Sequence, residues 1–129
     1  MPVDPAVVQR QLEALGDFDQ FFTRKEINHL PNILFPDEEI RGITSGMCDG
    51  DTWLIVVTTR RLIFLDRGML YGLRQMEMPL KQISAVSHST GLILAEINVS
   101  TSGGHKRIHY LLKSEAPKIA NIISGLISE

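Results

Sequence analysis

The histidines and the single cysteine of this 129-residue chain are the residues best suited to metal binding or nucleophilic chemistry. His105 and His109 are four positions apart, which on a helix would place two zinc ligands on one face. They fall instead across a predicted turn and strand, where four residues at about 3.3 Å each separate them by ~13 Å. Side chains that far apart cannot share an ion, so we predict no metal site.

Cys48 is the only thiol, and the next residue is Asp49. A nucleophilic cysteine needs a histidine or a cation to lower its pKa, whereas an adjacent carboxylate raises it. The serines lie in no Gly-x-Ser-x-Gly elbow, and Ser102-Gly103-Gly104 lacks the Lys-Ser/Thr pair of a phosphate-binding loop. The sequence therefore predicts a protein that is not an enzyme and uses neither a cofactor nor a small-molecule substrate.

The charges of the chain nearly balance, with 15 acidic and 13 basic residues and a net charge of −2. Nucleic-acid binders usually carry a basic excess, so we expect no nucleic-acid partner. Asp37-Glu38-Glu39 is interpreted as a solvated linker and Arg60-Arg61 as the polar corner of a hairpin. No apolar run approaches the ~18 residues of a membrane span, and the first residues lack a signal-peptide pattern. With one cysteine, these features predict a soluble cytoplasmic protein.

Two helices are predicted at the start of the chain. Pro5 can open the first, because a proline in the first turn loses no intrahelical hydrogen bond. A capping box at 23–26 starts the second, and Pro31 is expected to end it. The apolar positions of the first helix share one face; they are Val8, Leu12 and Leu15.

Three phenylalanines between these helices must also find a packing partner; they are Phe18, Phe21 and Phe22. Their rings bury too much area to remain in water, and so short a segment cannot form a core alone. We therefore expect the N-terminal helical segment, residues 1–32, to dock on an open strand edge or on the mouth of a barrel. The barrel could belong to the same chain or to a second copy, and the second case would produce self-association.

The remainder, residues 33–129, is predicted to be one mainly β domain. Its connections are too short for crossover helices, so the strands must be antiparallel. Asp49-Gly50 is a hairpin dipeptide that favours a type I′ turn. A wide apolar stripe from Ile119 to Ile127 predicts a helix over 116–128 that closes over the sheet. The seven predicted strands cover residues 40–47, 53–57, 62–65, 76–80, 83–89, 92–99 and 108–112.

Four stretches carry a resemblance to a known family: "HLPNILFPDEEI", "VVTTRRLIFLDRGMLYGL", "MPLKQISAVSHSTGLILAEINVSTSG" and the final helix. Over residues 25–129 the chain resembles the YokE-like bacterial pleckstrin-homology (PH) domains. The resemblance implies a seven-stranded antiparallel barrel or sandwich capped by a C-terminal helix. It also implies a scaffold or protein-interaction module.

Many PH domains bind phosphoinositides through basic residues of the first hairpin, which the resemblance places here at Cys48 to Asp51. The two aspartates in that loop would repel an inositol phosphate, so we expect no specific phosphoinositide binding. Two further loops should lie at the same end. Their apolar residues Met69, Leu70 and Tyr71 either fold back over the barrel mouth or the N-terminal helices, or form a contact surface for a protein partner or a second copy. Weak peripheral membrane contact is the alternative. The residues predicted for this surface are Arg67, Met69, Leu70, Tyr71, Lys106 and Arg107.

Overall fold

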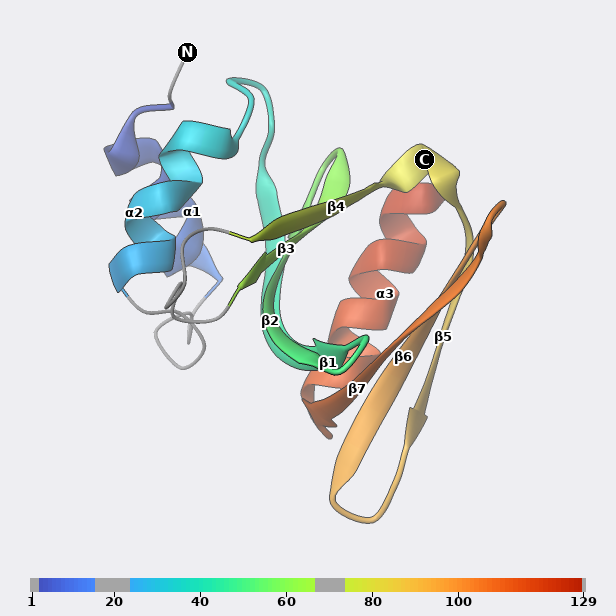
Figure 1. The fold of residues 1–129 in the computed structure, drawn as a ribbon. Coiled ribbons are helices and arrows are strands. Elements are labelled where there is room, and N and C mark those ends of the chain that lie inside the picture. The colour runs from blue at the N-terminus through green and yellow to red at the C-terminus, as the bar shows by residue number, and fades with distance from the viewer. Residues whose placement is uncertain (1–2, 16–23, 67–73, 129) are drawn as a thin grey trace.

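The computed structural model describes residues 3–15, 24–66 and 74–128, and these form the helices and strands of Figure 1. The predicted seven antiparallel strands and C-terminal helix are confirmed, and each predicted strand overlaps an observed one. The elements in chain order are α1 (Pro5–Ala14), α2 (Arg24–Ile33), β1 (Ile40–Cys48), β2 (Asp51–Thr58), β3 (Arg61–Asp66), β4 (Gln75–Pro79), the short 3₁₀ helix η3 (Leu80–Gln82), β5 (Ile83–Thr90), β6 (Leu94–Thr101), β7 (Gly104–Leu112) and α3 (Glu115–Ile127).

The strands form one antiparallel sheet in the order β4-β3-β2-β1-β7-β6-β5. Asp49 and Gly50 at the β1–β2 turn both have positive φ, at 53° and 84°, as the predicted type I′ turn requires. The two parts of the sheet join where β1 meets β7, at the pair Met47 and His109. A Cβ at Gly46 would lie 2.9 Å from the side chain of Ile108, so glycine permits this close approach.

The inner core lies between the two parts of the sheet and α3 (Figure 1). α3 packs on β5 and β1, and it supplies buried side chains from one face. Trp53 and Phe64 meet edge to face in this core, with ring centroids 6.3 Å apart. The buried residues of α3 are Ala116, Ile119, Ala120 and Ile123. The amphipathic pattern of the sequence therefore predicted both the helix and its packed face.

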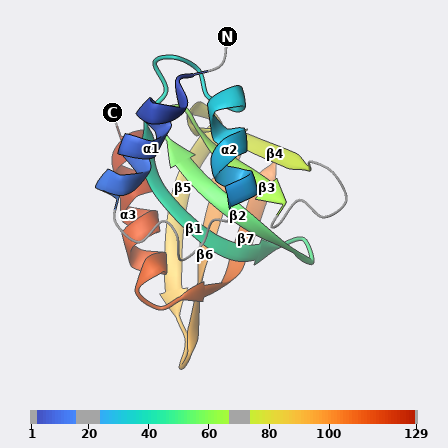
Figure 2. The ribbon, with the colours of Figure 1, turned by 90° about the vertical axis from the view of Figure 1, so that its left-hand side faces the viewer.

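A second core lies on the outer face of β1–β3, where α1 and α2 pack (Figures 1 and 2). The side chain of Gln11 accepts a hydrogen bond of 2.8 Å from the backbone N–H of Ile40, which ties α1 to β1. We expected a strand edge or the barrel mouth as the docking surface; the helices instead cover a broad face of their own sheet. The three phenylalanines lie outside the described residues. The buried members of this core are Val8, Leu12, Leu30, Leu34, Ile40, Ile43, Leu54, Val56, Ile63 and Leu65.

Several predicted boundaries differ from those of the structure, and the largest difference is in β7, which begins at Gly104 rather than at residue 108. Pro31 does not end α2, which continues to Ile33. The Pro31 carbonyl accepts a hydrogen bond from the N–H of Val3 instead. The predicted strand 92–99 begins only at Leu94, whose carbonyl accepts a hydrogen bond from Gly91 and closes a short turn.

None of the helices in the described part of the chain has both the length and the apolar character that a bilayer-spanning helix needs.

The docking of α1 gives a testable prediction for stability. Leu12 is fully buried in the second core, so Leu12→Ala should lower the free energy of unfolding by about 2–5 kcal/mol. Its neighbour Glu13 is exposed, and Glu13→Ala should change stability little. Urea denaturation of both variants measures the difference. Equal stability of the two variants would show that α1 does not pack on the sheet in solution.

Candidate functional site

The two arginines at the β2–β3 corner have different environments. Arg60 is exposed, whereas only 6% of Arg61 is accessible to solvent. Arg61 donates to both carboxylate oxygens of Glu38, at 2.9 and 3.0 Å, and to the carbonyl of Ile33 at 2.7 Å. It also forms an ion pair with Glu77 on β4. Arg61 therefore joins the end of α2, the linker before β1 and strands β3 and β4, which confirms a structural role at the corner.

Glu38 is buried, so our interpretation of residues 37–39 as solvated linker is wrong at this position. Burial raises the pKa of Glu38, but hydrogen bonds from Arg61, from the Thr58 hydroxyl and from the Phe35 N–H outweigh it and lower the pKa overall. The hydrogen bond with Glu38 likewise raises the pKa of Arg61. The pair is therefore fully charged at neutral pH, and its charges are satisfied within the fold.

Phe35 lies on the surface beside this buried pair, with 46% of its area exposed. The guanidinium carbons of Arg60 and Arg61 are 4.6 and 4.9 Å from the centre of its ring, within the range of a cation–π contact. Arg60 also binds Asp37 at 2.6 Å, and this hydrogen bond lowers the pKa of Asp37. The linker and the corner together thus present an aromatic ring and an exposed cation.

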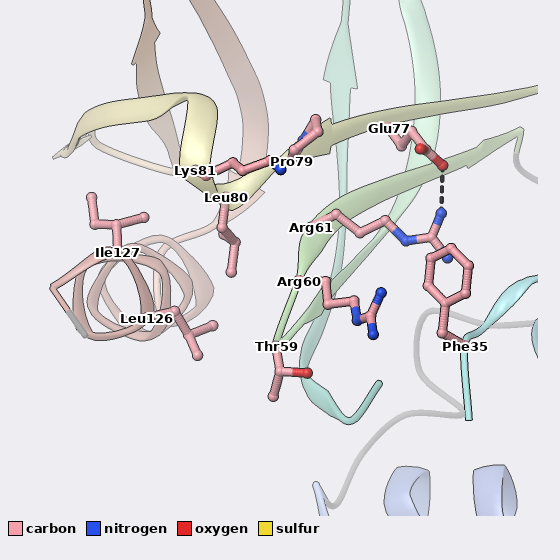
Figure 3. Close-up of a pocket in the computed structure, with 10 residues that line it drawn as sticks. All are labelled: Phe35, Thr59, Arg60, Arg61, Glu77, Pro79, Leu80, Lys81, Leu126 and Ile127. Atoms are coloured by element: carbon pink, nitrogen blue, oxygen red, sulfur yellow. Dashed lines mark hydrogen bonds and ion pairs between the residues drawn. The ribbon is translucent and has the colours of Figure 1, made fainter. Parts of the chain in front are cut away.

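An open pocket of about 570 Å³ lies beside this surface (Figure 3). Phe35 and the two arginines form one side of it, and Leu126 and Ile127 at the end of α3 lie opposite. Leu80 lies between the two sides, and Pro79 and Lys81 border it. The volume is typical of a ligand-binding site, and the lining is mixed, with apolar side chains and cations. Sequence reasoning missed this pocket because its walls come from four separate segments.

The predicted contact surface is only partly described by the structure. Lys106 and Arg107 are adjacent on β7, and alternation along a strand sends their side chains to different neighbours. Lys106 forms an ion pair with Asp49 in the β1–β2 turn, whereas Arg107 binds Glu96 on β6 at 2.7 Å. The structure therefore does not bring these two cations to one surface. The other predicted residues, Arg67, Met69, Leu70 and Tyr71, lie outside the described residues.

Ion pairs occupy the cations at the end that carries the β1–β2 turn. Arg74 binds Asp66 at 2.9 Å and Asp51 at 3.3 Å, and it lies over the ring of Trp53. Hydrogen bonds from Lys106 and Arg74 lower the pKa values of Asp49 and Asp66 respectively. These carboxylates are therefore ionised, and each described cation near the turn already has a carboxylate partner. A phosphorylated headgroup would have to displace those carboxylates.

The residues considered for catalysis and metal binding form no cluster in the described part of the chain. Burial, and then the charge of Asp49, raises the pKa of Cys48, so its thiol is poorly suited to act as a nucleophile. The Trp53 indole N–H donates to the backbone carbonyl of Cys48 at 3.1 Å, which fixes the start of β2 against the end of β1. Among residues 3–15, 24–66 and 74–128, no three His, Cys, Asp or Glu side chains are grouped as metal ligands would be.

The buried pair predicts unequal effects for the two neighbouring arginines. Arg61→Met leaves the Glu38 carboxylate buried without its partner and should cost about 3–5 kcal/mol of unfolding free energy. Arg60→Met, the matched control, should change stability little because its ion pair is exposed. Chemical denaturation at neutral pH measures both. Similar losses for the two variants would contradict the assignment of Arg61 as the buried anchor.

A pH series gives a second readout of the same pair. The pKa of Glu38 is lower in the folded state than in the unfolded state, where it is about 4.3. The stabilisation is therefore present above that value and is lost as the pH falls through the folded pKa. When the unfolding free energy is measured as a function of pH, Glu38→Gln should therefore lose less stability than the unmodified chain as the pH falls.

The ion pairs at the first hairpin predict an absence of headgroup-selective lipid binding. Vesicles that contain a phosphoinositide should bind the chain no better than vesicles with the same charge from phosphatidylserine. The double variant Asp49→Lys, Asp51→Lys frees Lys106 and half of the Arg74 contacts, and it should gain salt-sensitive binding of inositol hexakisphosphate. Selective, micromolar binding of a phosphoinositide by the unmodified chain in a vesicle assay would disprove the prediction.

Comparisons with known proteins identify the fold. A pleckstrin-homology domain from Shewanella amazonensis SB2B is 24% identical; the match covers 82% of this chain and 98% of that one, with a TM-score of 0.59. A DUF1696 family protein with a pleckstrin-homology domain, from Shewanella loihica PV-4, is 19% identical, with coverages of 80% and 91% and a TM-score of 0.58. No curated protein matches.

The family is shown by a model described as "Bacterial PH domain", which matches residues 34–125. The match extends from the linker that carries Glu38 into the last turn of α3, and so includes the whole sheet. Since it spans most of the chain, this protein belongs to the bacterial PH domain family.

Proposed function

We propose that this bacterial PH domain is a non-catalytic cytoplasmic scaffold of the YokE-like type. Its pocket between Phe35, the β2–β3 corner and the end of α3 would bind an amphipathic, acidic segment of a partner protein. The observation that carries the proposal is the composition of the pocket. Its volume is about 570 Å³, and its lining combines the exposed cations Arg60 and Lys81 with apolar side chains. A segment with apolar side chains on one face and carboxylates on the other complements both.

The apolar wall supplies the contact area. Leu126 and Ile127 are only partly buried at the end of α3, and the ring of Phe35 is exposed across from them. Leu80 is buried and fixes the floor between them. Aliphatic and aromatic side chains in a preformed hollow are typical anchors for a partner because they lose little conformational freedom on binding.

The cations supply the preference for acidic segments. Arg60 and Asp37 are both exposed, and an exposed ion pair is worth so little that a partner carboxylate can replace Asp37 at small cost. Lys81 is exposed at the border of the pocket and has no carboxylate partner among the described residues. Arg61 does not take part in this exchange because Glu38 and Glu77 hold it. It fixes the position of Phe35 instead.

Nothing in the pocket is arranged for catalysis among the residues described. Glu77 is the carboxylate in the lining, and it is held by Arg61. Thr59 has no histidine or free carboxylate beside it in the lining that could activate its hydroxyl. These features support a binding role.

Affinity capture with charge-reversed variants tests the proposal. The bait is the full chain, compared with Arg60→Glu, Lys81→Glu in the pocket and with Arg10→Glu, Lys118→Glu as a control of equal charge change elsewhere. A protein retained by the chain and by the control, but lost with the pocket variant, is the expected partner. A synthetic peptide of its acidic segment should then bind in a fluorescence anisotropy assay, at least about tenfold more weakly to the pocket variant.

Two outcomes would contradict the proposal. Equal capture by the pocket variant and the control would place the binding site elsewhere. The bait could instead retain only further copies of this chain, with a molecular mass in light scattering that is lower for the pocket variant alone. That result would show that the pocket mediates self-association and does not bind a partner protein.

A further inference from the structure

The exposed apolar side chains of the described residues are not scattered. Five large apolar side chains are exposed, and one of them, Phe35, belongs to the pocket. The other four lie on β7 and on the turn between β5 and β6. We call these four the hairpin-tip surface; they are Leu92, Ile93, Tyr110 and Leu112, with 95%, 80%, 56% and 43% of their areas exposed.

The four residues lie near one another, where the β5–β6 turn meets the end of β7. Leu112 is paired with Leu94, the first residue of β6 after the turn that carries Leu92 and Ile93. Tyr110 lines the same shallow hollow as Leu94. The ammonium group of Lys113 donates to the backbone carbonyl of Leu92 at 2.8 Å, which fixes the end of β7 against the turn.

The backbone of Tyr110 is itself unusual. Its φ is 59°, in the left-handed region that a bulky side chain rarely adopts. The irregularity lies opposite the register shift between Ala95 and Ile97 on β6, and it leaves His109 and Tyr110 both outside the core. An aromatic side chain is thus held at the surface in a conformation that regular strand geometry would not give. Strained backbone of this kind is frequent where a residue contacts a ligand.

We propose that the hairpin-tip surface inserts into the interfacial layer of an anionic phospholipid bilayer. The shape is the first argument for a lipid surface. In Figures 1 and 2 the β5–β6 hairpin projects from the rest of the molecule, at the end away from α1 and α2. Leu92 and Ile93 lie in the turn at its end, and most of their surface is exposed to solvent. A bilayer deforms around such a convex apolar tip, whereas a protein would need a matching cavity.

The charges near the tip are the second argument. The hairpin end from Ser87 to Leu94 contains no carboxylate, and Lys113 lies directly beside it. Glu115 follows in the first turn of α3, where it is only partly exposed, and Glu96 on β6 is paired with Arg107. An apolar apex that has a lysine beside it and no carboxylate of its own complements an anionic lipid surface. The ring of Tyr110, with an apolar body and a polar hydroxyl, is typical of the membrane interface.

Insertion of the hairpin-tip surface in a bilayer is compatible with partner binding at the pocket. α3 begins just after Lys113, next to the tip, and ends at the pocket with Leu126 and Ile127. Its 13 residues span ~20 Å, so a tip inserted in a bilayer leaves the pocket open toward the solvent. Two aliphatic side chains give weak attachment, below the ~10⁴ M⁻¹ of a single myristoyl chain. Several copies or a membrane-bound partner would strengthen it.

Vesicle co-sedimentation of the full chain tests the insertion. The probe is vesicles of phosphatidylcholine with phosphatidylglycerol, and vesicles of phosphatidylcholine alone serve as the comparison. The double variant Leu92→Ser, Ile93→Ser should lower the bound fraction at limiting lipid by about tenfold. Leu92→Ile, Ile93→Leu, which keeps the apolar area at the same two exposed positions, is the matched control and should bind as the unmodified chain does. Melting temperatures of both variants should stay unchanged because the replaced side chains are exposed.

A depth measurement separates insertion from surface attraction. In Leu92→Trp, lipids brominated on their acyl chains should quench the introduced indole. Trp53, buried in the inner core, should not be quenched in the unmodified chain. Failure of the chain to sediment, equal sedimentation of the double serine variant, or no quenching in Leu92→Trp would each overturn the proposal. If the chain does not bind vesicles but has the molecular mass of an oligomer, and only the double serine variant lowers that mass, the hairpin-tip surface contacts a second copy of the chain instead.

Discussion

The structure depends on one constraint, the burial of β2 and β3 on both faces. Along these strands successive side chains alternate between the inner and the outer core, so that Ile55 and Phe64 face inward while Leu54 and Ile63 face outward. Neither face can be left in water, because burial of such side chains is the main favourable term in folding. The terminal helix covers one side and the N-terminal helices the other. The layers of the molecule follow from this requirement.

The corner between β2 and β3 is a consequence of the same arrangement. With helices and linker packed over it, the polar turn cannot be fully solvated, and Arg61 is enclosed. A buried cation is tolerated only with a charged, hydrogen-bonded partner, and Glu38 supplies it. The pair in turn fixes the linker, and with it Phe35 and Arg60 beside the pocket. A requirement of packing thereby positions the candidate binding surface.

Much of the fold could be predicted from the sequence, because turn dipeptides and apolar periodicity act locally. Asp49-Gly50 predicted the position of the first hairpin turn. The apolar stripe after Pro117 predicted the final helix, with both ends within one residue of those observed. The unbroken apolar run through β2 is typical of strands covered on both faces, and that signal for the outer core was overlooked. The burial of Glu38 had no local signal, because it depends on hydrogen bonds between segments distant in the sequence. The exposure of Leu92 follows from its place in the turn between β5 and β6, which ends two residues later than predicted.

The outer core also bears on how this family diverges. The family model begins at residue 34, after α1 and α2, yet six aliphatic residues on the outer face of the sheet need those helices as cover. The family match and the packed unit therefore have different limits. A relative that kept the strands without the helices would expose these positions, and polar residues would be expected there. The six positions are Ile40, Ile43, Leu54, Val56, Ile63 and Leu65.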